Sequence, residues 1–144
     1  MDELPDEVAG VGTPPVRYQS NSGNNVVDVF SVVDKYRLNF YEGHALKYLV
    51  RLGRKGTDES NLGKCRHFLK EAELRAPVLV SWIECGAHPD MPVKSVLEAF
   101  GLTLNPAIKD VATRLLTSKI DNEPRYWLRS AGEVLDSYLE GTYD

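Results

Sequence analysis

Residues 43–56 read Gly-His-Ala-Leu-Lys-Tyr-Leu-Val-Arg-Leu-Gly-Arg-Lys-Gly. Small and apolar residues at positions 45, 48, 49 and 52 recur with the three- and four-residue spacing of an α-helix. Cations stand at positions 47, 51, 54 and 55, and the same helix brings them close to one face. The stretch therefore predicts a helix over 42–54 that packs through one side and carries a row of positive charge on the other.

The composition is that of an ordinary globular chain, long enough for one domain or for two small repeats that share a core. No apolar run approaches the roughly 18 residues of a membrane helix. The N-terminus is acidic and lacks the apolar centre of a signal peptide. We therefore expect a cytoplasmic protein with no membrane partner, in which Cys65 and Cys85 are reduced, buried thiols.

Charge is distributed unevenly along the chain. The formal net charge is −4, yet cations concentrate between Arg37 and Arg75 while acids dominate elsewhere. A protein that binds double-stranded nucleic acid usually has a basic footprint over a whole face. The pattern argues against a duplex partner and favours a local site for a small anion, of which phosphate is the leading candidate.

Apolar stripes predict helices along most of the chain after a flexible N-terminal segment, 1–25, which is rich in helix breakers. The continuously apolar run from Pro77 to Cys85 is expected to be buried, and we favour a helix there, although periodicity alone does not separate helix from strand. The other helices are expected at 26–36, from Thr57 or Asp58 onward, at 93–100, from Asn105-Pro106 onward and from Asn122 onward.

The predicted helices fall into two units, 26–75 and 76–144, with matching apolar stripes. We interpret them as degenerate repeats of one three-helix unit in a compact all-α domain; the alternative is that any two triplets of amphipathic helices can be aligned. Only Arg51 keeps its charge in this alignment, at Arg114. The other first-unit positions, His44, Lys47, Arg54 and Lys55, correspond to Ala107, Asp110, Thr117 and Ser118. The basic face is therefore expected in the first unit alone.

Residues 17–72 resemble the SaV-like family of phage proteins, some of whose members are described as nucleotide kinases. The family signature Gly-Asn-Ala-x-Lys-Tyr-x-x-Arg-x-Gly-x-Lys-Gly matches 43–56, with His44 in place of Asn. Arg17-Tyr18 stands where the family has His-Tyr. The remaining matches are Asp28, Leu38-Asn39-Phe40, and Asp58 with Leu62 and Lys64. The resemblance implies a phage-encoded protein that acts on nucleotides in the infected host cell.

The charge pattern and the resemblance together suggest roles for individual residues. Catalytic candidates are His44, as an acid or base near neutral pH, and Asp28, although a hydrogen-bonded helix histidine is the alternative for His44. Mg²⁺ is a candidate cofactor, held by Asp28, Asp34, Glu42 or Asp58. The spacing of the histidines predicts no structural zinc. The candidate phosphate- or nucleotide-binding residues are Lys47, Arg51, Arg54, Lys55, Gly56, Tyr18 and Lys64.

Three functions remain open on the sequence. The first is a nucleoside monophosphate kinase, which would lack the usual phosphate loop because no Gly-x-x-x-x-Gly-Lys-Ser/Thr motif occurs. The second is a non-catalytic nucleotide binder, for example one that sequesters a host signalling nucleotide. The third is an inhibitor whose basic face binds an acidic host protein. A solvated helix face is the alternative explanation of the cations. We also expect a homo-oligomer, because the second unit carries few charges in its stripes.

Overall fold

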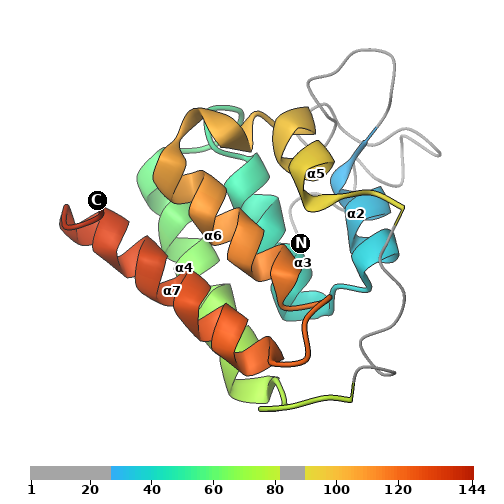
Figure 1. The fold of residues 1–144 in the computed structure, drawn as a ribbon. Helices are drawn as coiled ribbons and strands as arrows, with labels where there is room; N and C mark the ends of the chain where they lie inside the picture. The colour runs from blue at the N-terminus through green and yellow to red at the C-terminus, as the bar shows by residue number, and fades with distance from the viewer. Residues whose placement is uncertain (1–26, 82–89) are drawn as a thin grey trace.

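We describe residues 27–81 and 90–144 of a computed structural model of the chain. They form helices and no β-strand, which confirms the all-α prediction (Figure 1). None of these helices is both long and apolar enough to cross a bilayer. The predicted flexible segment, Tyr18 and Cys85 lie outside the described residues. The elements are α2 (Val29–Tyr36), α3 (Phe40–Val50), α4 (Asp58–Arg75), α5 (Val93–Ala99), the 3₁₀-helix η2 (Leu102–Leu104), α6 (Pro106–Thr117) and α7 (Pro124–Glu140).

Side-chain caps fix where most helices begin, because the first turn of a helix has backbone N–H groups without intrahelical partners. The Asn39 side chain accepts a hydrogen bond from the Glu42 amide, and the Glu42 carboxylate accepts one from the Asn39 amide, so the two form a capping box. Asn105 caps α6, with Pro at the first helical position, as predicted. Thr57 caps α4. Asn122 does not cap α7, which begins at Pro124 without a side-chain cap.

The helices pack as two hairpins that share one core. α3 packs against α4, α6 packs against α7, and α4 and α7 join the hairpins; the short α2 and α5 pack on α3 and α6 (Figure 1). Leucines fill the centre because burial of large apolar side chains is the main favourable term in folding. The largest fully buried side chains are Leu46, Leu49, Leu69, Leu115, Leu116, Leu128 and Leu135.

The two units bury equivalent positions, and this corrects the register of our sequence alignment. Buried positions 42, 45, 46, 49 and 50 of α3 match buried positions 108, 111, 112, 115 and 116 of α6 at a constant offset of 66 residues. In this register Lys47 corresponds to Thr113 and Arg51 to Thr117, whereas the sequence alignment pairs Arg51 with Arg114. The second unit therefore keeps neither cation. The duplication itself stays a prediction.

The predicted basic helix ends earlier than expected. Arg51 follows the last residue of α3 as its C-cap, and the amides of Arg54 and Lys55 both donate to the Arg51 carbonyl. Gly53 and Gly56 have φ of 75° and 72°, the left-handed region that glycine enters without a steric penalty and that a continuing helix does not use. Arg54 and Lys55 therefore lie in a turn, so the four cations do not form a row on one helix.

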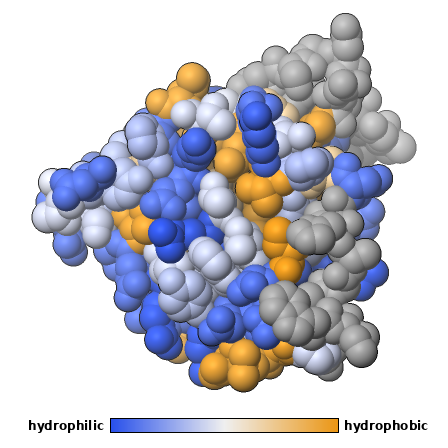
Figure 2. Space-filling model, in the orientation of Figure 1, coloured by the Kyte–Doolittle hydropathy of each residue, from blue (hydrophilic) through white to orange (hydrophobic). Residues whose placement is uncertain are grey.

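The apolar run after α4 is irregular and exposed in its described part, 77–81, where we had predicted a buried helix. Pro77 explains the end of α4, because a proline drives the preceding residue into an extended conformation, and Ala76 has φ −79° and ψ 143°. Val78 and Leu79 are 59% and 63% exposed. Figure 2 shows apolar surface at the lower edge of the molecule, where this segment leaves α4 in Figure 1.

Cys65 is fully buried in α4, and burial raises the pKa of its thiol to about 12 from an ordinary value of 9.0. Because the thiolate is the reactive form, a shift of this size lowers the labelling rate about a thousandfold even before steric shielding is counted. In the Cys85→Ser variant we expect a thiol reagent at pH 8 to label the native protein only as fast as it unfolds. Rapid labelling without urea would contradict the burial of Cys65.

Candidate functional site

Three of the predicted phosphate-binding cations converge on one aromatic ring, that of Tyr48 in α3. The Nζ atoms of Lys47 and Lys64 lie 4.7 and 5.4 Å from the ring centroid, and Cζ of Arg51 lies 5.2 Å from it. The electron-rich face of an aromatic ring attracts cations at such distances. Tyr48 is therefore a shared contact of three cations, two from the end of α3 and one from α4.

The three cations differ in how far they reach solvent. Arg51 is only 5% exposed and Tyr48 only 8% exposed. Lys47 is half-buried and Lys64 is exposed. The expectation of a solvent-facing row is thus wrong for Arg51, whose guanidinium lies below the surface. Lys64 is therefore the cation most open to a ligand in solution, and Arg51 the least.

Aromatic rings continue from Tyr48 along the seam between α3 and α4. Phe68 stacks on Tyr48 with centroids 6.0 Å apart and an interplanar angle of 13°. His44 lies 4.9 Å from Phe68 and 4.1 Å from Phe40, which is 59% exposed. Sequence periodicity did not predict that these rings lie together. We call the combined surface the ring-and-cation face; it consists of Phe40, His44, Lys47, Tyr48, Arg51, Lys64 and Phe68.

His44 is held in place by its own helix. Its Nδ1 lies 2.7 Å from the carbonyl oxygen of Phe40, one turn earlier. A carbonyl can only accept, so Nδ1 carries the proton of this hydrogen bond and Nε2 is the other ring nitrogen available to a ligand. This geometry is the hydrogen-bonded helix histidine that the sequence left as the alternative to an acid or base, and the two roles are compatible.

The turn after α3 is bonded to α4 instead of presenting its backbone to a ligand. The Gly53 amide donates to Asp58 Oδ1 at 3.1 Å, and Asn61 Nδ2 donates to the Lys55 carbonyl at 2.8 Å. Burial lowers the pKa of the Arg54 guanidinium in this turn. Gly56 supplies the left-handed bend. Of the predicted binding residues, Arg54, Lys55 and Gly56 are therefore placed in a structural link outside the ring-and-cation face.

The N-terminus of α4, which follows Gly56, is capped by a side chain. Thr57 Oγ1 accepts a hydrogen bond from the Ser60 amide at 3.1 Å. Asp58 and Glu59 stand in the first turn, where carboxylates interact favourably with the helix dipole. A phosphate at this helix end would meet two like charges, so we exclude it from the site.

Three of the four carboxylates considered for catalysis or Mg²⁺, Asp28, Glu42 and Asp58, have structural partners. Asp28 caps α2 by accepting the Ser31 amide at 2.7 Å. Glu42 is 3% exposed and pairs with Lys119, with Nζ 3.0 Å from Oε1. Within the described residues, no group of three or more His, Cys, Asp or Glu side chains is arranged to hold a metal ion. The structure thus brings none of these carboxylates to the ring-and-cation face.

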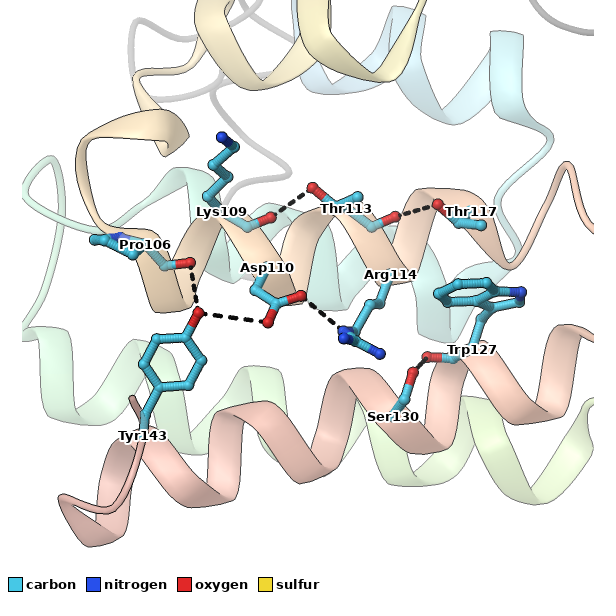
Figure 3. Close-up of polar contacts among 9 residues, drawn as sticks. All are labelled: Pro106, Lys109, Asp110, Thr113, Arg114, Thr117, Trp127, Ser130 and Tyr143. Atoms are coloured by element: carbon cyan, nitrogen blue, oxygen red, sulfur yellow. Dashed lines mark hydrogen bonds and ion pairs between the residues drawn. The ribbon is translucent and has the colours of Figure 1, made fainter.

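In the α6–α7 hairpin, the counterpart in the second unit, Arg114 meets a carboxylate of its own helix (Figure 3). Arg114 Nε lies 2.7 Å from Asp110 Oδ1, and the guanidinium lies 5.9 Å from the ring centroid of Trp127. The Tyr143 hydroxyl lies 3.4 Å from the second Asp110 oxygen. Among the described residues, one cation, Arg114, lies over the Trp127 ring, whereas three cations lie around the Tyr48 ring. The gathering of three cations makes the ring-and-cation face the candidate anion site.

Comparisons with protein-family models, with curated proteins and with solved structures find no match to this chain. The resemblance to the SaV-like family therefore stays a prediction. The structure defines a helical domain in which three cations gather around Tyr48, near the exposed ring of Phe40.

Proposed function

We propose that the protein binds a nucleotide at the ring-and-cation face. The observation that carries the proposal is the gathering of Lys47, Arg51 and Lys64 around the Tyr48 ring. A phosphate bound beside these cations gains charge-assisted hydrogen bonds, which are stronger than those between neutral groups.

The aromatic part of the face suits the base of a nucleotide. Phe40 is exposed beside His44 and Phe68, and stacking of a base on an aromatic side chain contributes about 1–3 kcal/mol. A nucleotide carries a stacking group and a phosphate in one molecule, which matches rings and cations on one face. The proposal is confined to binding, because the carboxylates that phosphoryl transfer would need serve as caps and ion-pair partners.

The test is a thermal-shift titration with nucleoside mono-, di- and triphosphates and cyclic nucleotides. We expect at least one nucleotide to raise the melting temperature in a saturable way. Lys64→Ala should weaken its binding about tenfold, because one charge-assisted contact is worth about 1.5 kcal/mol. Lys70→Ala, an exposed lysine on the same helix but outside the ring-and-cation face, is the matched control and should bind like the wild type.

Two further ligands separate the contributions of ring and cation. The unphosphorylated nucleoside should bind far more weakly than the nucleotide, and inorganic phosphate should bind without any contribution from Phe40. If no nucleotide at millimolar concentration changes the melting temperature, the proposal fails, and an acidic protein becomes the better candidate for the positive surface.

A further inference from the structure

A pocket of about 290 Å³ lies where the turn after α3 meets the link between α5 and α6. Its walls come from both units of the fold: Gly53 and Asp58 from the first, and Gly101, Asn105 and Tyr138 from the second. None of the described residues that line this pocket belongs to the ring-and-cation face. It is therefore a separate candidate site.

Buried apolar side chains of the core form the floor of the pocket, and the more accessible Leu52 and Leu104 stand above them. Leu49 is 0% exposed, Ile108 4% and Leu62 7%. A dry cavity of about 150 Å³ accommodates a benzene-sized molecule, so 290 Å³ leaves room for an aromatic ring with a short side chain. Pockets of this kind bind through an apolar body and a few polar groups that fix its orientation.

The polar groups that line the pocket indicate which charge its ligand carries. Asp58 is the one formally charged residue among the described residues that line the pocket. One of its carboxylate oxygens accepts the Gly53 amide at 3.1 Å, which leaves the other oxygen for a ligand donor. Arg54 and Lys55 belong to the same turn but do not line the pocket.

Tyr138 adds a second polar group to the lining of the pocket. Its hydroxyl oxygen accepts a hydrogen bond from Asn105 Nδ2 at 3.1 Å. The Asn105 oxygen is itself occupied by the amides of Ala107 and Ile108 at the start of α6. The phenol is thus held at a fixed position, and its oxygen keeps a second lone pair for a donor.

We propose that this pocket binds a small organic cation, with an ammonium group at Asp58 and Tyr138 and an apolar body against Leu52 and Leu104. An ammonium group supplies donors to the carboxylate and the phenol oxygen, and its charge complements the one charge of the rim. An anionic ligand would meet repulsion from Asp58. The inference does not depend on nucleotide binding, because the two sites select opposite charges.

The test uses phenethylamine as the probe, followed through the amide signals of Gly53 and Gly101, which both line the pocket. We expect a saturable shift of both signals. Phenethyl alcohol, which has the same body without the charge, should bind about tenfold more weakly, and phenylpropanoate should give no saturable shift.

Two matched variants assign the effect to the carboxylate. Asp58→Asn keeps an oxygen for the Gly53 amide and should weaken phenethylamine binding about tenfold. Glu59→Gln removes the neighbouring charge of the same helix turn, outside the pocket, and should leave the affinity unchanged. Equal losses in the two variants, equal affinity for the alcohol, or no saturable shift of the glycine signals would each overturn the proposal.

Discussion

Glu42→Ala is expected to lower the free energy of unfolding by about 3 kcal/mol. Glu42 is 3% exposed, and its Oε1 both accepts the Asn39 amide at 2.9 Å and pairs with Lys119 Nζ at 3.0 Å. Removing one partner of a buried ion pair costs about 3–5 kcal/mol, because the other charge is left uncompensated. The lower end applies because the Lys119 side chain is 24% exposed and reaches some solvent. Urea unfolding at pH 7 measures the loss.

Glu42→Gln separates the cap from the charge. The glutamine keeps an oxygen for the Asn39 amide but cannot pair with Lys119, so we expect an intermediate loss of about 1–2 kcal/mol. Lys119→Met, which leaves the carboxylate buried without its partner, should also destabilise. A loss below about 1 kcal/mol for Glu42→Ala would show that the carboxylate is not structural, and would reopen its role as a metal ligand.

The caps and apolar stripes could be predicted from the sequence because they depend on residues within one or two turns of each other. Asn105-Pro106 is such a local signal, and α6 begins there. The end of α3 could not be predicted in the same way. A glycine such as Gly53 is tolerated in many helices, so only its backbone φ of 75° in the folded chain shows that the helix has already ended.

The candidate site, too, could be predicted from the sequence only in part. Helical spacing placed Lys47 and Tyr48 on opposite sides of one helix, whereas the Lys47 ammonium lies 4.7 Å from the Tyr48 ring centroid. The approach of Lys64 and Phe68 depends on the packing of α4 against α3. Periodicity within one segment does not say which face of another segment it meets. The burial of Arg51 was unpredictable for the same reason, because a cation is expected at the surface unless tertiary contacts cover it.

The second large loss of stability is expected at the interface between the two units. Leu69 of α4 and Leu135 of α7 hold equivalent positions there, 66 residues apart in the sequence. Both are 0% exposed. We expect Leu69→Ala and Leu135→Ala each to lower the free energy of unfolding by about 3 kcal/mol, since a buried leucine truncated to alanine costs about 2–5 kcal/mol. The volume-conserving Met variants are the controls and should lose less than about 1.5 kcal/mol.

These two variants also decide whether 26–75 and 76–144 unfold as separate units. α4 and α7 pack against each other, so the core is continuous across the proposed repeat boundary. Each variant should therefore shift a single cooperative transition, with the same dependence on urea as the wild type. Two separated transitions, with each variant moving only the one that contains its own helix, would contradict a shared core. In that case each hairpin would be a folding unit of its own, and the packing of α4 on α7 would be the contact between two units instead of the centre of one domain.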